Sequence, residues 1–179
     1  MQHILIQSRS NPMKKISIIG SGGSGKSTLA KKLEEKMRIP AYHLDALYWQ
    51  PGWVGTERSK WRSIQEKLCS KDEWILDGNY GATLDIRLKN SDTIIFLDIN
   101  KFTCLARAVW RSIKSYGKTR SDMAAGCKEQ LDIKFAKWIL EYPAKNKPEI
   151  LSRLASLPSD KNIVILRSAK EVEAFLDAV

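Results

Sequence analysis

The residues from Gly20 to Ser27 have the types and the spacing that hold a chain of phosphate groups. They read Gly-Ser-Gly-Gly-Ser-Gly-Lys-Ser, which fits G-x-x-x-x-G-K-[ST] at every fixed position. Backbone N–H groups surround phosphates only where no Cβ blocks them, and a helix that begins at the loop adds the positive end of its dipole. The loop therefore predicts a nucleotide site, whose contacts are assigned to Gly20, Ser21, Gly22, Gly23, Ser24, Gly25, Lys26, Ser27 and Thr28.

The last two fixed positions of the motif supply the chemistry. The Lys26 ammonium is expected to reach the β- and γ-phosphates, and the Ser27 hydroxyl is expected to ligate Mg²⁺. A β-branched run precedes the motif at 16–19, and a helix-forming run follows it at 28–36. Because the motif is meaningful only between a strand and a helix, this context supports ATP and Mg²⁺ as ligands and Lys26 as a catalytic residue.

Length and composition suit one soluble domain of 179 residues, with 43% hydrophobic and 28% charged residues. The chain contains no apolar run of the roughly 18 residues that a membrane span needs, and no signal-peptide pattern. The three cysteines lack metal-binding spacing, which indicates reduced thiols in a cytoplasmic protein. Residues 1–12 are expected to be a flexible extension, and 13–179 a single domain. The net charge of +10 favours anionic ligands, either phosphate compounds or nucleic acid.

Strand and helix patterns alternate along the chain, which predicts an α/β fold with a parallel sheet and helices on both faces. Strands are expected at 15–19, 41–44, 74–77, 93–98 and 162–166. Helices are expected at 26–37, 57–69, 84–88, 122–141, 148–156 and 170–178. Pro143 and Pro148 are expected to break the helix that ends at 141. Five strands with right-handed crossovers, and a phosphate loop after the first, give a doubly wound sheet.

Three aspartates, Asp45, Asp77 and Asp98, follow expected strands. Ligands of such sheets lie beyond the carboxyl ends of the strands, so these carboxylates are candidates for metal binding or proton transfer. Each has a simpler alternative role. Asp45 can form a turn with its own backbone, Asp77 can form a turn or cap before Gly78, and Asp98 can cap the next helix.

Five stretches resemble the bacterial topology-modulation proteins, a branch of the adenylate-kinase-like P-loop kinases. They are the phosphate loop, 42–49 (YHLDALYW), 77–80 (DGNY), 117–120 (GKTR) and 166–172 (LRSAKEV). The resemblance covers about 13–179 and implies a P-loop NTPase fold with sheet order 2-3-1-4-5, ATP, Mg²⁺ and a mobile helical lid. It places Asp77 beside the metal that Ser27 holds, and Arg167 is assigned to the nucleotide site.

A basic stretch from Ile99 to Ser121 contains no acidic residue and is interpreted as part of a lid at about 107–130. Arg107 and Arg111 are four residues apart and share one helical face, where two guanidinium groups can neutralise a transferring phosphoryl group. Arg120 lies on a loop that would close over ATP. All three arginines are assigned to catalysis, and an ordinary solvated basic face is the alternative.

The acceptor side is expected at about 41–69. Asp45 is assigned to catalysis and to substrate binding, because phosphoryl transfer to an alcohol needs a carboxylate that orients its hydroxyl or accepts its proton. Tyr48, Trp49 and Tyr80 are also assigned to the substrate. The alternative for the aromatic residues after Asp45 is a surface cluster that covers the core. His43 is expected to be structural.

The sequence departs from the adenylate-kinase pattern after Asp77 and Gly78. Adenylate kinases continue with an aromatic residue, Pro and an Arg that contacts the acceptor phosphate, whereas this chain continues with Asn79 and Tyr80. The nearest arginine is Arg87, which is assigned to an acceptor anion, with a salt bridge to Asp85 as the alternative. AMP is therefore not assigned as the acceptor.

These features predict ATP-dependent phosphoryl transfer to a small molecule, which is a nucleoside, a nucleotide or a hydroxylated metabolite. A second hypothesis is a nucleic-acid-associated ATP-binding regulator of DNA topology, suggested by the net charge and by the name of the similar family. The basic residues from Lys101 to Arg120 are interrupted by apolar ones, whereas nucleic-acid-binding stripes tend to be longer and cover a whole face. The distribution of charge therefore favours the kinase.

Overall fold

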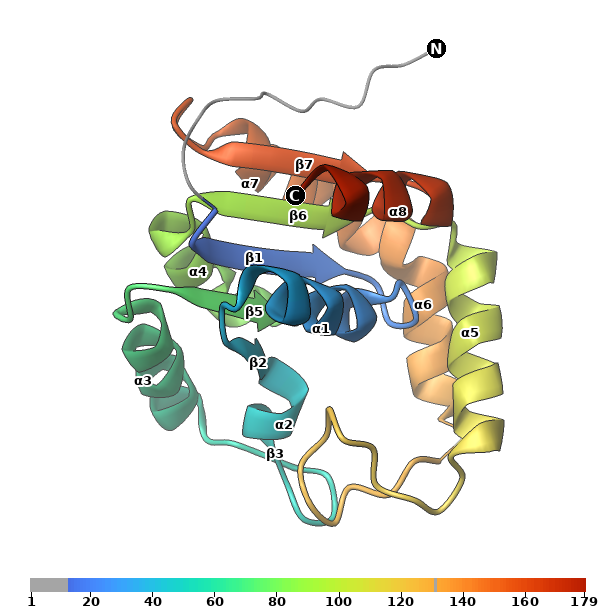
Figure 1. The fold of residues 1–179 in the computed structure, drawn as a ribbon. Coiled ribbons are helices and arrows are strands. Elements are labelled where there is room, and N and C mark those ends of the chain that lie inside the picture. The colour runs from blue at the N-terminus through green and yellow to red at the C-terminus, as the bar shows by residue number, and fades with distance from the viewer. Residues whose placement is uncertain (1–12, 131) are drawn as a thin grey trace.

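The computed structural model describes residues 13–130 and 132–179, so the expectation for residues 1–12 lies outside the described residues. At its centre is a sheet of five parallel strands in the order β2-β5-β1-β6-β7 (Figure 1). These strands are β1 (Lys15–Gly20), β2 (Ala41–His43), β5 (Trp74–Asp77), β6 (Thr93–Leu97) and β7 (Asn162–Leu166). The short strands β3 (Trp49–Gln50) and β4 (Val54–Gly55) form a separate antiparallel hairpin. The predicted α/β fold with a five-stranded parallel sheet is confirmed.

Helices cover both faces of this sheet (Figure 1). They are α1 (Lys26–Met37), α2 (Leu44–Tyr48), α3 (Arg58–Cys69), α4 (Leu84–Asn90), α5 (Lys101–Lys114), α6 (Ile133–Lys145), α7 (Lys147–Ala155) and α8 (Ala169–Ala178). One apolar core joins α1 and α8 to the sheet, and a second joins α4, α6 and α7 to the opposite face. Among the described residues, no helix is both long enough and apolar enough to cross a bilayer.

The strand β6 shows why the sheet has two cores. Its five residues are all buried, and it pairs with β1 along one edge and with β7 along the other. Successive side chains of a strand point to opposite faces, so Ile95 and Leu97 enter the core under α1 while Ile94 and Phe96 enter the core under α4. The unbroken apolar run of this strand is typical of a central parallel position.

The segment between α5 and α6 contradicts the predicted helical lid. The helix expected to begin at 122 begins at Ile133, where the Asp132 side chain accepts hydrogen bonds from the first turn. Residues 115–130, here called the strap, contain no helix and only two isolated β-bridges. Gly117 and Gly126 adopt left-handed backbone angles in the strap, with φ of +72° and +79°, which interrupt a helix.

Two further boundaries differ from the prediction. Pro143 does not break α6, which continues to Lys145. A proline so near the end of a helix costs it only one backbone hydrogen bond, so the last turn can still form. Pro148 lies in the first turn of α7, where its missing N–H has no helical partner to lose. The strand β2 ends at His43, so Asp45 lies in the first turn of α2 instead of at a strand end.

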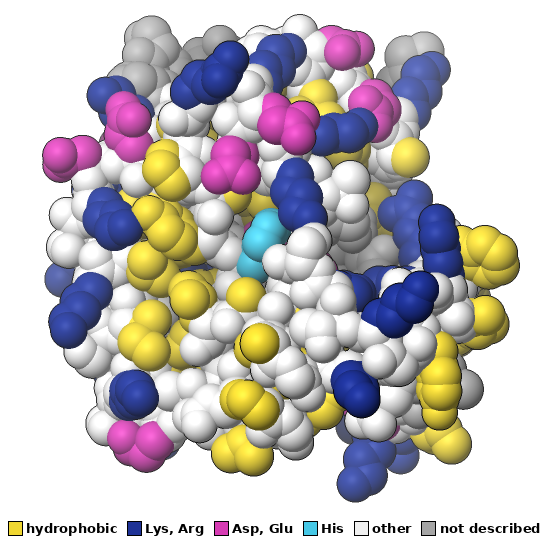
Figure 2. Space-filling model, turned by 60° about the horizontal axis from the view of Figure 1, so that its bottom comes forward, with side chains coloured by type: hydrophobic (Ala, Val, Ile, Leu, Met, Phe, Trp, Pro, Cys, Tyr) yellow, Lys and Arg dark blue, Asp and Glu magenta, His cyan; other side chains and the backbone are white. Residues whose placement is uncertain are grey.

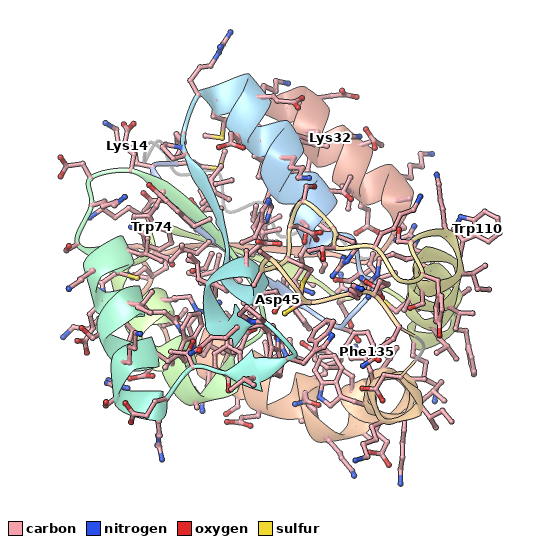
Figure 3. The ribbon with its side chains drawn as sticks, turned by 90° about the horizontal axis from the view of Figure 1, so that it is seen from below. Lys14, Lys32, Asp45, Trp74, Trp110 and Phe135 are labelled. Carbon is pink, nitrogen blue, oxygen red and sulfur yellow. The ribbon has the colours of Figure 1, made fainter. Side chains whose placement is uncertain are left out.

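The helix α5 is unusual because large hydrophobic side chains lie on its solvent side. Phe102, Trp110 and Ile113 are exposed, and Figure 3 shows Trp110 pointing away from the molecule. Figure 2 shows Lys and Arg side chains gathered on the side of α5 and the strap, with acidic side chains mostly elsewhere on this face. The basic character that the sequence indicates for this region is therefore visible on the surface.

Candidate functional site

The phosphate loop joins β1 to α1 and is built from tightly packed backbone. A Cβ at Gly20 would lie 2.7 Å from the carbonyl oxygen of Leu97, and one at Gly23 would lie 2.1 Å from that of Cys104. Gly23 and Gly25 have φ of +74° and +99°, which L side chains rarely adopt. The glycines are therefore needed for packing and for backbone conformation at this place, whatever the loop binds.

Several polar groups of the loop have no protein partner, which fits a bound anion. The hydroxyls of Ser21 and Ser24 are buried without a hydrogen-bond partner among the described residues. The N-cap of α1 is Gly25, so no side chain caps the free N–H groups of the first turn. Lys26 Nζ donates to the Ser21 carbonyl at 2.8 Å. These residues fit the phosphates of ATP, because phosphate oxygens would satisfy the free donors.

The charge of Lys26 depends on two of the predicted carboxylates. Burial lowers the pKa of the Lys26 ammonium, and the negative charges of Asp45 and Asp77 act in the opposite direction. Asp45 and Asp77 therefore lie close enough to Lys26 to interact electrostatically with it. The sequence placed all three at the carboxyl end of the sheet, and the structure brings them together there.

Two other elements lie against the phosphate loop. A Cβ at Gly22 would lie 2.4 Å from the ring of Phe135, at the start of α6, so this ring lies directly on the loop. Figure 3 shows Phe135 between α6 and the centre of the molecule. Arg107 of α5 has Nη1 4.0 Å from the place that a Cβ of Gly25 would take. Arg107 is thus beside the loop, as its predicted role requires, whereas Phe135 was not predicted.

Asp77 is buried at the end of β5 and is bonded to a histidine. Its Oδ1 lies 2.7 Å from His43 Nδ1, because β2 and β5 pair in a register that sets these residues side by side. The hydrogen bond to Asp77 raises the pKa of His43 above its ordinary value. The sequence indicated only a structural His43, since the partner lies 34 residues away. Correct pairing of the two expected strands is the signal that would have found it.

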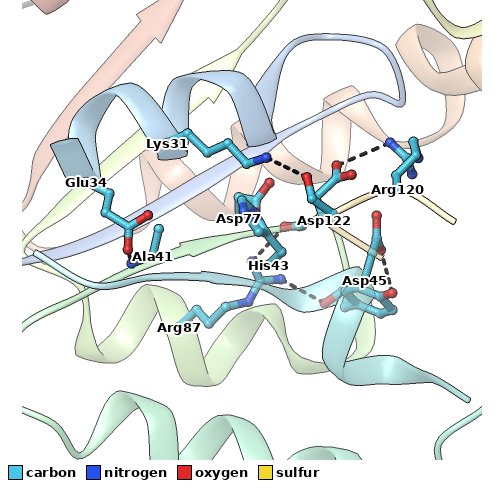
Figure 4. A network of polar contacts seen from close by, with 12 residues as sticks. Lys31, Glu34, Ala41, His43, Asp45, Asp77, Arg87, Arg120 and Asp122 are labelled. Carbon is cyan, nitrogen blue, oxygen red and sulfur yellow. Dashed lines mark hydrogen bonds and ion pairs between the residues drawn. The ribbon is translucent and has the colours of Figure 1, made fainter. Parts of the chain in front are cut away.

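A carboxylate that the sequence analysis missed lies near the Ser27 hydroxyl. It belongs to Asp122 of the strap, which accepts a hydrogen bond from Arg120 Nη1 at 3.2 Å (Figure 4). Burial alone would raise the pKa of the Asp122 carboxyl, but the charge of Arg120 and the Ser27 hydroxyl lower it. No local pattern marks Asp122, because Ser27 stands in a helix 95 positions earlier in the chain.

The two remaining lid arginines are paired with acids in the strap. Arg120 Nε lies 2.7 Å from Glu129 Oε2, and Arg111 Nη2 lies 3.6 Å from Glu129 Oε1. Glu129 is 6% exposed and also accepts a hydrogen bond from Ser112 at 2.9 Å. The predicted basic stretch ends at Ser121, and acidic residues that follow it in the sequence fold back against its arginines. Arg111 and Arg120 are therefore not free guanidinium groups in this structure.

Asp45 is held by a tyrosine inside an aromatic cluster. The Tyr80 hydroxyl donates to Asp45 Oδ1 at 2.6 Å. Tyr48 packs against Trp49, Trp61 and Tyr80 with ring centroids 4.7–5.1 Å apart, and Trp61 is buried. These rings pack on one another, which agrees with the alternative of a cluster that covers the core. Asp45 and Tyr80 remain partly exposed at its edge.

Arg87 contradicts its predicted role. Its side chain is fully buried and donates to the carbonyl oxygens of Gly78 and Tyr80, at 2.8 and 3.2 Å. Burial lowers its pKa to about 10. The alternative is also wrong, because Asp85 pairs with Arg62 at 2.9 Å. Arg87 therefore fixes the backbone that follows β5, and it does not reach a ligand.

Asp98 and Arg167 lie together at the ends of β6 and β7. Asp98 Oδ2 binds Lys147 at 2.8 Å and has Arg167 Nε at 3.8 Å. Asp98 does not cap α5, since Asn100 accepts the capping hydrogen bond. Asp98 is thus paired with the Lys147 ammonium, whereas Asp45 and Asp77 are the carboxylates that act on Lys26 of the phosphate loop.

A parallel sheet with a phosphate loop after its first strand, leading into a helix, defines a P-loop protein of the α/β class. Comparison with solved structures agrees with this class. The chain is similar to a shikimate kinase from Bacteroides thetaiotaomicron, with a TM-score of 0.56 and 16% identity over 91% of this chain and 94% of that chain.

Two other solved structures have the same kind of fold. A shikimate kinase from Acinetobacter baumannii in complex with shikimate has a TM-score of 0.57 and 14% identity over 93% of this chain and 90% of that chain. A gluconokinase from Sinorhizobium meliloti 1021 has a TM-score of 0.51 and 17% identity over 93% of each chain. No family model and no curated protein sequence matches the chain. The chain thus has a kinase-like P-loop fold.

Proposed function

We propose that the protein transfers a phosphoryl group from ATP to a hydroxyl group of a small molecule. The supporting observation is that a phosphate loop with unpartnered donors and the Asp45–Tyr80 pair lie within electrostatic reach of one ammonium group, that of Lys26. The Lys26 ammonium can thus act on the γ-phosphoryl group that leaves ATP, while Asp45 acts on the acceptor hydroxyl. The names of the similar structures, shikimate kinase and gluconokinase, favour a hydroxylated acceptor.

Each proposed role follows from the position of a side chain. The acceptor oxygen forms a bond to the γ-phosphorus, the bond from that phosphorus to the bridging oxygen breaks, and the hydroxyl proton passes to Asp45. Tyr80 holds the Asp45 carboxylate at 2.6 Å and so orients it. Lys26 and Arg107 stabilise the negative charge on the transferring group. Arg111 joins α5 to the strap through Glu129, and Arg120 braces the strap internally through Glu129 and Asp122.

The proposed cation site uses oxygen ligands, which suit Mg²⁺. Ser27 lies in the first turn of α1, and Asp77 lies at the end of β5, next to β1. Mg²⁺ bound there would neutralise charge on the β- and γ-phosphates. Arg167, Tyr48 and Trp49 keep their proposed nucleotide and acceptor roles, and Arg87 does not.

A panel of acceptors tests this function directly. The protein, ATP and Mg²⁺ are incubated with sugar acids, polyols and nucleosides, and phosphorylated products are detected by mass spectrometry. We expect product from at least one hydroxylated compound. The proposed function fails if the panel yields none while the protein binds ATP.

Asp45→Asn, with Tyr80→Phe as the matched control, tests the proton acceptor. Loss of the carboxylate should lower kcat by roughly 10²–10⁴-fold and leave the affinity for ADP nearly unchanged. Tyr80→Phe keeps the carboxylate and removes only its hydrogen bond, so its loss of kcat should be much smaller. Full transfer by Asp45→Asn would show that the acceptor needs no base.

The resemblance to topology-modulation proteins leaves DNA as an alternative partner. The pairing of Arg111 and Arg120 with Glu129 reduces the positive charge that the strap could offer to DNA. Binding of a labelled duplex at several salt concentrations separates the two functions. A steep loss of affinity with salt, together with no transfer product, would favour the nucleic-acid function.

A further inference from the structure

His43 and Asp77 lie on the face of the sheet that carries α1. Successive side chains of a strand point to opposite faces. Ala41 and Ile75 pack in the core under α1, whereas the residue that follows each of them packs in the cluster with α3 on the opposite face. His43 and Asp77 come two positions after Ala41 and Ile75 and end their strands. Both side chains therefore return to the side of α1 at the carboxyl end of the sheet (Figure 4).

This end of the sheet also carries the phosphate loop. β5 pairs with β1 in a register that sets Asp77 opposite Ile18, two residues before the loop begins, and Gly78 N donates to the Ile18 carbonyl at 3.1 Å. Burial lowers the pKa of Lys26 and the negative charge of Asp77 opposes this, so the carboxylate lies near the start of α1. Asp77 therefore stands beside the helical turn that contains Ser27.

A hydrogen bond from His43 fixes one oxygen of the Asp77 carboxylate. His43 Nδ1 lies 2.7 Å from Asp77 Oδ1, and the pairing of β2 with β5 sets the two residues opposite each other. An ionised carboxylate only accepts hydrogen bonds, so Nδ1 carries the proton. Only 14% of the His43 side chain and 4% of the Asp77 side chain are exposed, so water competes little for this bond. While Oδ1 is held, Oδ2 keeps a fixed direction in which it can accept a cation.

We propose that His43 is a positioning residue, which orients the Asp77 carboxylate for the divalent cation of the nucleotide. The inference rests on the proposed function, since it takes Asp77 to be the carboxylate that meets this cation. A partner that holds a metal ligand in this way affects metal affinity without touching the metal. The histidine thus does more than join β2 to β5, which the backbone ladder between these strands already does.

Binding of ADP tests the proposal without using catalysis. ADP affinity is measured by calorimetry in EDTA and across a Mg²⁺ titration, for the full-length wild type and for His43→Leu. We expect His43→Leu to raise the Mg²⁺ concentration for half-maximal tightening by roughly 10–100-fold, the usual effect of losing a partner that orients a metal ligand. ADP affinity in EDTA should stay nearly unchanged, because the packing of the phosphate loop is retained. The same measurement shows that the variant is folded.

His43→Asn is the rescue variant, and Tyr42→Phe is the matched control. The amide nitrogen of asparagine lies about where imidazole Nδ1 lies, so it can still donate to Asp77, and the Mg²⁺ midpoint should return toward that of the wild type. Tyr42→Phe removes a hydroxyl that binds Lys71 on the other face of the same strand, so it should leave the midpoint unchanged. His43→Leu combined with Asp77→Asn should be no worse than Asp77→Asn alone, since both act through one carboxylate.

Two results would overturn the positioning role of His43. One is an unchanged Mg²⁺ midpoint in His43→Leu. The other is an equal loss in His43→Leu and His43→Asn, because the ring and not its hydrogen bond would then matter. If the wild type itself fails to bind ADP, or binds it without any effect of Mg²⁺, the proposed function or its cation site is refuted instead.

Discussion

The phosphate loop and the strap both lie at the carboxyl end of the sheet, but different groups hold them in place. Backbone atoms hold the phosphate loop, where Gly20 and Gly23 pack against the carbonyl groups of Leu97 and Cys104. Side-chain contacts hold most of the strap, through the ion pair of Glu129 with Arg111 of α5 and through hydrogen bonds from Lys31 and Trp53. One region is therefore part of the folded core, and the other is attached to the surface of the core.

This difference predicts how each region responds to a ligand. The phosphate loop is pre-organised, since its conformation is fixed by the strands and helices that touch it. The strap can detach by breaking one ion pair to α5 and a few hydrogen bonds to other elements, while the sheet and its two cores remain intact. Ligand-dependent motion is therefore expected in the strap and not in the phosphate loop.

Lys26→Ala should have the largest effect on function. Removing the ammonium from the pre-organised loop should lower phosphoryl transfer by roughly 10²–10³-fold, as removal of a charge-stabilising donor does. The temperature of unfolding should stay within a few degrees, because Lys26 makes no described ion pair and its single hydrogen bond is to the Ser21 carbonyl. Transfer is measured with the acceptor from the panel, and unfolding by circular dichroism. Near-normal transfer would refute the catalytic role of the loop.

Gly23→Ala and Gly117→Ala compare the two regions with one type of substitution. Both glycines have nearly the same φ, +74° and +72°, so the backbone strain of an alanine is similar. A Cβ at Gly23 would also collide with Cys104, whereas none of the described atoms lies within 4 Å of one at Gly117. We expect Gly23→Ala to lower the free energy of unfolding by about 2–5 kcal/mol, and Gly117→Ala by about 1–2 kcal/mol. Equal losses in urea denaturation would remove the distinction between the regions.

The same contrast explains how much of the structure the sequence predicts. The phosphate loop, β5 and β7 follow from local patterns, in which a motif or an apolar run lies within one segment. The pairing of Asp77 with His43 depends on a contact between two strands that are distant in the sequence, and the position of Asp122 near Ser27 depends on the path of the strap. Arg87 was misassigned for the same reason, because a charged residue in a short helix gives no local sign that tertiary packing buries it.

Glu129→Gln should detach the strap without unfolding the protein. The substitution removes the charge that pairs with Arg111 and Arg120, so a local opening should become more frequent. Cys127 reports this opening, because its thiol is buried in the strap. We expect its labelling rate by a thiol reagent to rise roughly 10-fold, a change of about 1.4 kcal/mol in the opening equilibrium.

Cys69 gives the internal reference for that experiment. Its thiol is buried between α3 and the sheet, and burial raises its pKa to about 11, so its labelling requires a larger opening. Mass spectrometry of the labelled peptides separates the two sites. Equal acceleration at Cys69 and Cys127 would mean that the whole domain was destabilised, which would contradict an independently attached strap.

The smallest expected effect is a pH dependence of protein stability that arises from His43, which lies in the central sheet and not in the strap. The hydrogen bond to Asp77 raises the pKa of His43 above its ordinary 6.5 in the folded state. The protonated form is therefore favoured by folding, and the stabilisation is fully present below about pH 6.5. It is lost as the pH rises through the raised pKa of the folded state. We expect the free energy of unfolding of the wild type to exceed that of His43→Gln by about 1 kcal/mol at pH 6 in EDTA.

The difference between wild type and His43→Gln should shrink toward alkaline pH, and urea denaturation at several pH values measures it. Because β2 and β5 hold this pair, Cys127 labelling in the strap should not follow the same pH curve after correction for thiol ionisation. A stability difference that grows with pH would mean that neutral His43 is the favoured form. The hydrogen bond from His43 to Asp77 would then not be the interaction that stabilises the folded state.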